Sequence, residues 1–234
     1  MLSNDTTVSM SQIGPDGQMR AFDLINVMQD CTLLWLGSEP AMADWMEREG
    51  IIMVATFRQA DIVRRPRYGE KLHTETSVYA TKSYLGYRDT WVFDEAGEPV
   101  AKSWCMGAWV DKTTGKAVRI PADVIDAITI DPEREMEKAP RKVKLPKADP
   151  APLPDFAVRR SEADLYGHVN NTRYIRMAWD FLPEGFAIAR ICVEYKSQAR
   201  PGDRIYPVVY ETDDGFTYVL KAADDTVYSV IKFS

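Results

Sequence analysis

The same order of expected elements occurs twice in this chain of 234 residues, and this internal repeat is the strongest constraint on its fold. In each half, a loop with a glycine leads into an amphipathic helix, and a series of strand-like runs follows. Asp16-Gly17-Gln18 aligns with Tyr166-Gly167-His168, and residues 68–72 align with 201–205. A long helix must bury one face, and a curved antiparallel sheet can cover it. The repeat predicts an α+β fold of two tandem modules, each a long helix wrapped by an antiparallel sheet.

Apolar periodicity places the elements within each half. The pattern predicts helices over 21–36, 41–49, 121–128 and 171–182. It predicts strands over 51–57, 58–63, 71–80, 88–93 and 100–110, and over 187–195, 204–211, 215–222 and 227–233 in the second half. Residues 1–12 are polar and are expected to contain a first strand.

A proline-rich segment separates the two halves. Residues 131–155 are charged, lack an apolar period and carry six prolines. This composition is typical of an extended connector. We therefore expect a first domain over 1–130, a linker over 131–155 and a second domain over 156–234.

The loop before the second helix concentrates polar side chains within eight residues, namely Asp164, Gly167, His168, Asn170 and Asn171. Asn170 or Asn171 is expected to cap the helix, because a short amide oxygen can accept from free N–H groups of the first turn. A helix start favours negative charge, so it can stabilise a polarised carbonyl, with the oxyanion on amides near residues 167–170. Asp164 can then activate water or attack directly, and His168 can orient groups or shuttle a proton. The alternative is that these residues only tie down a turn.

The repeat also indicates that the two modules differ in chemistry. On the alignment, Gly14 stands at the position of Asp164, and Gln18 stands at that of His168. The first half therefore lacks both the acid and the histidine. We expect chemistry in the second module and another role, such as binding, in the first.

Charge and composition exclude several classes of protein. The chain has 35 acidic and 29 basic residues, which argues against nucleic acid as a main partner. Two histidines and three widely spaced cysteines make a transition-metal site unexpected and favour reduced thiols in the cytoplasm. We expect no cofactor. The sequence has no signal-peptide pattern and no stretch near the roughly 18 apolar residues of a membrane helix, so no membrane insertion is expected.

The segment Asp164–Tyr174, D-L-Y-G-H-V-N-N-T-R-Y, resembles the active-site segment of the tandem hotdog-fold acyl-acyl carrier protein (ACP) thioesterases of plants and bacteria. Further likenesses lie in residues 109–112, 120–128 and 193–196. The resemblance implies two hotdog modules that release free fatty acid and ACP from fatty acyl-ACP in fatty acid biosynthesis. The first hotdog would shape the acyl pocket, and the second would carry catalysis by Asp164 and His168. ACP would be the partner of a monomer or homodimer. The basic cluster of the linker is either a solvated face or a contact with an acidic carrier protein, and its members are Arg141, Lys142, Lys144 and Lys147.

Two departures from the family pattern concern the site. Tyr166 stands where the family has an asparagine, and Gln198-Ala199 stands where plant members have Glu-Cys. Gln198 cannot act as a base at neutral pH, although it can hold a water molecule. The expected catalytic residues are therefore Asp164, Tyr166, His168 and Gln198, and the expected substrate-binding residues are Gly167, Asn170 and Asn171. An acyl-CoA thioesterase and a non-catalytic acyl-thioester binder are the alternatives, and Cys192 is expected to be a core residue.

Overall fold

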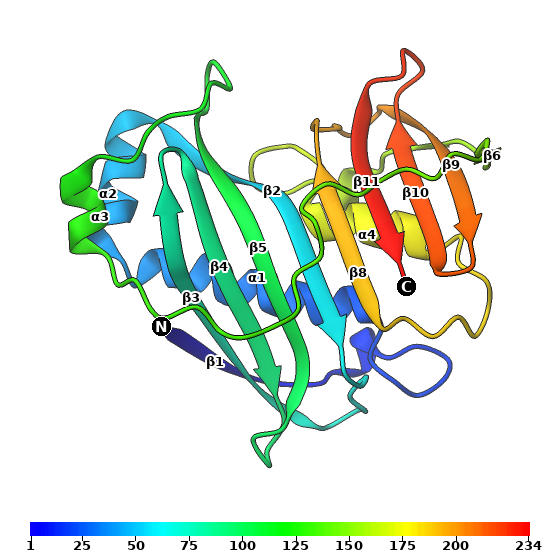
Figure 1. Cartoon of the computed structure of the whole chain (residues 1–234), viewed down its shortest axis with the longest axis horizontal. Coiled ribbons are helices and arrows are strands. Elements are labelled where there is room, and N and C mark those ends of the chain that lie inside the picture. Colours follow the sequence, from blue (N-terminus) through cyan, green and yellow to red (C-terminus); the bar gives the residue numbers. More distant parts are fainter. The chain divides into compact units, whose positions relative to one another are not determined.

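The computed structural model describes residues 1–234 and divides into two compact units (Figure 1). Unit 1 comprises Met1–Thr56 and Ala60–Lys138, and unit 2 comprises Phe57–Gln59 and Ala139–Ser234. Each unit pairs a helix with antiparallel strands, which confirms the predicted α+β class. The division falls inside the predicted linker, and the boundaries 1–130, 131–155 and 156–234 stay a prediction.

Unit 1 is built around its longest helix, α1 (Ala21–Gly37), which packs against strands β3 and β4. The strands follow the order β1-β3-β4-β5-β2. Their bounds are β1 Leu2–Thr7, β2 Ile51–Ile62, β3 Lys71–Lys82, β4 Leu85–Phe93 and β5 Pro99–Asp111. The side chains that α1 buries recur at helical spacing, and they include Leu24, Ile25, Met28, Cys31 and Trp35. The periodicity of the sequence therefore identified the face that the sheet covers.

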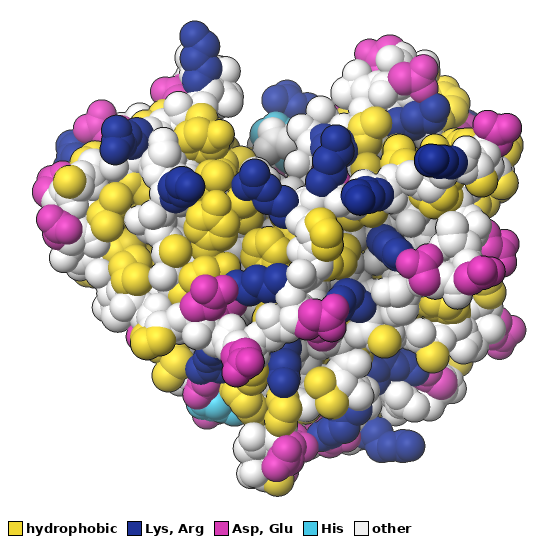
Figure 2. All heavy atoms as spheres, in the orientation of Figure 1, with side chains coloured by type: hydrophobic (Ala, Val, Ile, Leu, Met, Phe, Trp, Pro, Cys, Tyr) yellow, Lys and Arg dark blue, Asp and Glu magenta, His cyan; other side chains and the backbone are white.

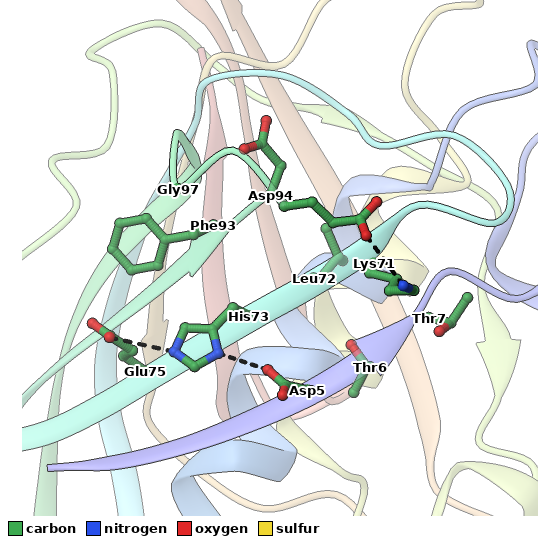
Figure 3. Close-up of a pocket in the computed structure, with 11 residues that line it drawn as sticks. Asp5, Thr6, Thr7, Lys71, Leu72, His73, Glu75, Phe93, Asp94 and Gly97 are labelled. Carbon is green, nitrogen blue, oxygen red and sulfur yellow. Dashed lines mark hydrogen bonds and ion pairs between the residues drawn. The ribbon is translucent and has the colours of Figure 1, made fainter.

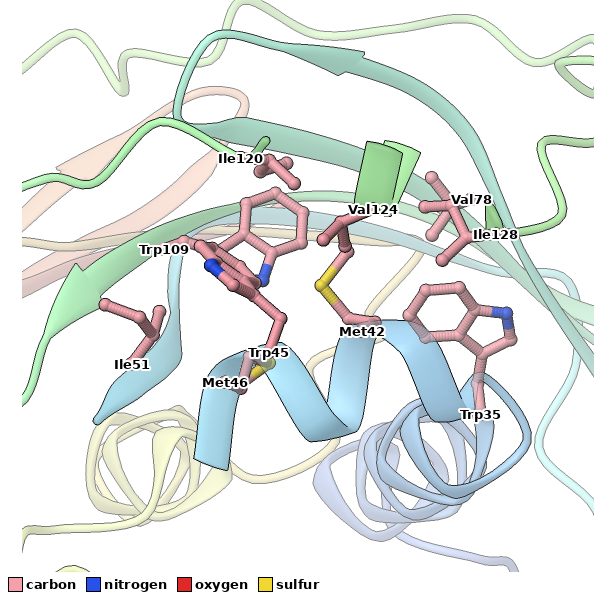
Figure 4. Packing of buried hydrophobic residues seen from close by; sticks show 10 residues of the cluster. All are labelled: Trp35, Met42, Trp45, Met46, Ile51, Val78, Trp109, Ile120, Val124 and Ile128. Carbon is pink, nitrogen blue, oxygen red and sulfur yellow. The ribbon is translucent and has the colours of Figure 1, made fainter. Parts of the chain in front are cut away.

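A cluster of large apolar side chains fills one end of unit 1 (Figure 4). It joins α1 to α2 (Pro40–Glu49), α3 (Ala122–Ala127) and strand β5. Its largest members are Trp35, Met42, Trp45 and Trp109, each nearly inaccessible to solvent. The packing is close at Gly86, where an added Cβ would overlap ring atoms of Trp109. Trp104 and Trp109, at the two ends of the aromatic run of β5, are both buried.

Unit 2 has the same plan with a shorter helix. Helix α4 (Asn171–Trp179) packs against β10 and β11. The antiparallel strand order is β8-β11-β10-β9, with bounds β8 Arg190–Tyr195, β9 Arg204–Thr212, β10 Gly215–Lys221 and β11 Val227–Phe233. Two short strands, β6 (Ala151–Pro152) and β7 (Phe156–Ala157), pair with β9 and were not predicted.

The structure corrects two predicted boundaries. Residues 51–57 and 58–63 are not two strands but one continuous strand, β2. The helix predicted over 171–182 ends at Trp179, because the N–H groups of Phe181 and Leu182 donate to carbonyls only three residues back. Such tighter bonds are common in a last helical turn, and Pro183 then prevents continuation.

The connector is held to the unit on each side by hydrogen bonds of its backbone. In unit 1, the N–H of Asp131 donates to the Val78 carbonyl over 2.9 Å. In unit 2, the N–H of Leu153 donates to the Pro207 carbonyl over 3.0 Å. The basic side chains of Arg141, Lys142, Lys144 and Lys147 are exposed, whereas those of Arg134 and Lys138 are partly buried and form ion pairs with Glu75 and Glu133. On the face seen in Figure 2, basic and acidic side chains are interspersed. None of the helices is long and apolar enough to cross a membrane.

Candidate active site

The site predicted from the sequence is a tight loop in unit 2 that leads directly into α4. The N–H of Asp164 donates to the His168 carbonyl over 2.8 Å, and the N–H of Gly167 donates to the Asp164 carbonyl over 3.0 Å. Gly167 has a φ of 76°, a conformation that L side chains rarely adopt. The backbones of Ala163 and Val169 form an antiparallel β-bridge that closes the turn. The turn therefore brings Asp164 and His168 together at its base.

The carboxylate of Asp164 is fixed by its own loop. Its Oδ1 accepts hydrogen bonds from the N–H groups of Tyr166, over 2.8 Å, and His168, over 3.2 Å. The second oxygen, Oδ2, accepts no hydrogen bond from the protein. Asp164 is half-buried, so this oxygen is oriented without being sealed from solvent.

The ring of His168 contacts a residue that the sequence did not single out. Nη2 of Arg200 lies 3.3 Å from Nε2 of His168. The signal for Arg200 was present in the repeat, because Arg67 and Arg200 precede the aligned glycines by two residues. His168 is half-buried, whereas Arg200 is exposed.

The start of α4 shows which of the two asparagines caps the helix and which donors are left free. Asn170 is the N-cap, and its Oδ1 accepts from the N–H of Thr172 over 3.0 Å. The N–H groups of residues 167–170 all donate to protein oxygens, the last two to the carbonyls of Ala199 and Glu162, so the predicted placement of the oxyanion near these amides stays a prediction. The N–H of Asn171 and the side-chain amide donors of Asn170 and Asn171 remain for a ligand.

The segment of Gln198 and Ala199 is tied to the loop through backbone groups. The N–H of Ala199 donates to the Tyr174 hydroxyl over 2.8 Å, and its carbonyl accepts from the N–H of Val169 over 2.9 Å. Burial raises the pKa of the Tyr174 phenol to about 12, so this hydroxyl stays protonated at neutral pH. Gln198 itself is exposed, and its side chain bonds to neither Asp164 nor His168.

Tyr166 lies at the tip of the loop. It is 52% exposed, and its phenol makes no hydrogen bond to the protein. The structure therefore groups Asp164, Gly167, His168 and the helix cap, whereas the side chains of Tyr166 and Gln198 are not joined to Asp164.

A buried glutamate supports the loop from below and was also missed by sequence reasoning. Glu162 is 5% exposed, and its carboxylate accepts from the N–H of Arg159 over 2.7 Å and from Nη2 of Arg176 over 3.0 Å. Its carbonyl accepts from the N–H of Asn170 over 2.9 Å. These bonds connect the short turn before the loop to the helix after it.

The aligned loop of unit 1 repeats this backbone without its chemistry. The N–H of Gly14 donates to the Gln18 carbonyl over 2.8 Å, and Gly17 has a φ of 74°. The loop has a glycine where unit 2 has Asp164 and a glutamine where unit 2 has His168. Asp16 forms an ion pair with Arg65, the counterparts of Tyr166 and Gln198. This geometry confirms the predicted alignment, with the acid and the histidine in unit 2 alone.

A separate open groove of about 690 Å³ lies in unit 1 beside β1 and β3 (Figure 3). His73 lies between two carboxylates there, with Nδ1 2.6 Å from Asp5 Oδ1 and Nε2 3.4 Å from Glu75 Oε1. Lys71 pairs with Glu95 across the same groove. Because these charged groups are paired with one another, we assign the groove no chemistry.

The cysteines do not contribute a nucleophile. Cys31, Cys105 and Cys192 are buried and form no disulfide, as expected. Burial raises the pKa of the Cys31 thiol to about 11, which disfavours a thiolate. The ring nitrogen Nε2 of His168 meets Arg200 rather than a thiol. No group of acidic, histidine or cysteine side chains in the described chain is arranged to hold a metal ion.

Comparisons with known proteins agree with this architecture. The family model of the acyl-ACP thioesterase N-terminal domain matches residues 3–128, and that of the C-terminal domain matches residues 148–232. No curated protein sequence matches the chain.

Two solved structures share the fold over nearly the whole chain. An acyl-ACP thioesterase from Bacteroides thetaiotaomicron has a TM-score of 0.88 and 19% identity, with 99% of this chain and 96% of that chain covered. The 12:0-ACP thioesterase from Umbellularia californica has a TM-score of 0.87 and 16% identity, with 100% and 96% covered. With family models matching both halves, the chain belongs to the acyl-ACP thioesterase family of thioester hydrolases, built from tandem hotdog folds.

Proposed function

We propose that unit 2 hydrolyses the thioester of fatty acyl-ACP with water as the nucleophile and Asp164 as the general base. The observation that carries this assignment is the carboxylate of Asp164. Two backbone N–H groups hold its Oδ1, and Oδ2 has no protein partner. A base that is fixed in this way and half-exposed can accept a proton from water without first breaking an internal bond.

The proposed reaction has two steps. In the first, the water oxygen attacks the thioester carbon, its proton passes to Asp164, and the carbonyl becomes an oxyanion. In the second, the carbon–sulfur bond breaks, and the departing thiolate takes the proton from Asp164. The products are the free fatty acid and ACP with its thiol restored, and the carboxylate of Asp164 is regenerated.

The groups proposed to bind the oxyanion lie at the start of α4. The dipole of a helix N-terminus favours negative charge, and the N–H of Asn171 is one of the donors that no intrahelical carbonyl can satisfy. The side-chain amides of Asn170 and Asn171 add donors. Gln198 and Tyr166 are proposed to hold water at the exposed side of the site.

Unit 1 is proposed to shape the acyl pocket. Its loop lacks an acid at Gly14 and is closed by the Asp16–Arg65 ion pair, so it offers no base for hydrolysis. Its helix α1 buries an apolar face twice as long as that of α4. ACP is the proposed partner, in fatty acid biosynthesis in the cytoplasm.

The test is hydrolysis of acyl-ACPs of several chain lengths by the wild type and by Asp164→Asn. An asparagine keeps the Oδ1 acceptor and the loop, but it cannot take a proton, so kcat is expected to fall about 100- to 10,000-fold. Asp16→Asn makes the same change in the loop of unit 1, which offers no base, and its kcat should stay close to the wild-type value. Turnover that survives in Asp164→Asn would assign the base elsewhere.

Two results would support other functions. Faster turnover of acyl-CoA than of acyl-ACP with the same acyl chain would make the protein an acyl-CoA thioesterase. Binding of acyl-ACP without turnover of any thioester would make it an acyl-thioester binder.

A further inference from the structure

We propose that Arg200 is a positioning residue that fixes His168 as the neutral tautomer with its proton on Nδ1. This inference rests on the proposed function, because it assigns His168 a defined part in hydrolysis: His168 donates a hydrogen bond and does not remove a proton. The carrying observation is the contact of 3.3 Å between Nη2 of Arg200 and Nε2 of His168.

The direction of this hydrogen bond follows from the chemistry of the two groups. A guanidinium has donors only, so the imidazole nitrogen that it contacts must accept. A neutral imidazole has one nitrogen that accepts and one that carries hydrogen, and the partner of the first decides the tautomer. With Nε2 accepting from Arg200, the proton resides on Nδ1. Nδ1 has no protein partner, so it can donate to a ligand.

The backbone on both sides of Arg200 is held in place by hydrogen bonds. The N–H of Arg200 donates to Asp203 Oδ2 over 2.8 Å, and the N–H of Asp203 donates back to the Arg200 carbonyl over 3.0 Å. The preceding residue, Ala199, is bonded to Tyr174 of α4 and to Val169 of the loop. The same elements that build the loop therefore fix the backbone from which the Arg200 side chain reaches His168.

This tautomer gives the site a side-chain hydrogen-bond donor for the oxyanion. The backbone N–H groups of residues 167–170 are already bonded within the protein, so they cannot serve the reacting carbonyl. An Nδ1–H donor at His168 supplies a hydrogen bond to the oxyanion that these backbone groups cannot make. A donor fixed before the reaction stabilises developing charge most effectively, because no reorganisation is needed in the transition state. Proton removal then falls to Asp164.

Unit 1 provides an internal comparison. Arg67 occupies the position of Arg200, and its N–H donates to Glu70 Oε1 over 2.7 Å, as that of Arg200 does to Asp203. Gln18 occupies the position of His168, and its backbone forms an antiparallel β-bridge with that of Arg67. The fold therefore places an arginine here in both units, and only unit 2 combines it with a histidine. Arg67 is thus a matched control for Arg200.

The first measurement is ¹⁵N NMR of the imidazole rings in protein labelled at histidine. The chain has two histidines, and His73→Gln assigns the signals of His168. At a pH where both rings are neutral, we expect the His168 signals of an acceptor Nε2 and a protonated Nδ1. In Arg200→Gln the populations should shift toward protonation of Nε2, and Arg67→Gln should leave them unchanged. A wild-type His168 with its proton on Nε2 would overturn the proposal, and so would an unchanged spectrum in Arg200→Gln.

Kinetics separate positioning from substrate binding. Loss of the Nδ1–H donor should lower kcat of Arg200→Gln about 10- to 100-fold with little change in KM, and Arg200→Lys should recover part of it. An increase in KM with an unchanged kcat would instead mean that Arg200 binds an anionic part of the substrate, and it would overturn the proposal. The NMR result does not depend on turnover. Activity that survives in Asp164→Asn therefore counts against Asp164 as the base. The tautomer of His168 is tested separately by the NMR spectrum.

Discussion

Asp164 and His168 hold each other by two hydrogen bonds. The N–H of Asp164 donates to the His168 carbonyl over 2.8 Å, and the N–H of His168 donates to Asp164 Oδ1 over 3.2 Å. The carboxylate therefore has a structural part as well as its proposed catalytic one. The two roles can be separated by substitution. Asparagine keeps an oxygen that accepts the hydrogen bonds of the loop, but it cannot act as a base.

Asp164→Ala should be both inactive and less stable, whereas Asp164→Asn should be inactive and nearly as stable as the wild type. Alanine leaves the N–H groups of Tyr166 and His168 without their acceptor, which should lower the free energy of unfolding by about 1 kcal/mol. Denaturant titration of both variants measures this difference. Equal stability of the two would mean that water replaces the carboxylate in the loop at no cost.

Asn170→Ala should destabilise unit 2 by removing the cap of α4. The Oδ1 of Asn170 accepts from both the N–H and the hydroxyl of Thr172. Replacing an N-cap asparagine by alanine costs about 1 kcal/mol. The control is Asn170→Ser, which keeps a capping oxygen and should lose much less in the same thermal unfolding experiment. A similar loss in both variants would place the effect in the side-chain amide rather than in the cap.

Gly86→Ala should destabilise unit 1 because its Cβ would overlap Cη2 and Cζ3 of Trp109. The Trp109 ring is 1% exposed and packed in the apolar cluster, so it cannot move aside freely. Overpacking of this kind costs about 1–3 kcal/mol in unfolding free energy. Gly37→Ala is the control, since an added Cβ there meets no atom within 4 Å, and its stability should be unchanged or slightly higher. Equal stability of the two variants would show that the cluster can expand at Gly86.

The pairing of strand β1 with β3 should become weaker as pH rises. The hydrogen bond to Asp5 raises the pKa of His73 above its usual value, and Glu75 acts in the same direction. A raised native pKa means that the stabilisation is complete below the unfolded pKa of about 6.5 and is lost as pH rises through the native value. His73→Gln should therefore reduce stability most at low pH, and the difference from wild type should shrink toward pH 8. A difference that grows with pH would contradict this assignment.

The sequence determined the elements and the local parts of the site. Apolar spacing identified α1 and α4, and two asparagines before an amphipathic run, Asn170 and Asn171, were the candidates for its cap. The alignment of the two halves located Asp164 and His168 in one repeat only. These features depend on residues within a few positions of one another, so their pattern is written in the order of the chain.

Only the tertiary structure decided which groups of the site are free and which are already bonded. The N–H of Val169 is bonded to the carbonyl of Ala199, thirty residues further along the chain, and His168 meets Arg200 from the same distant segment. These bonds leave the N–H of Asn171, next to those amides, as the free backbone donor. A hydrogen-bond partner supplied by a distant segment depends on how the chain folds back, and the spacing of residues near the site does not record which donors it occupies.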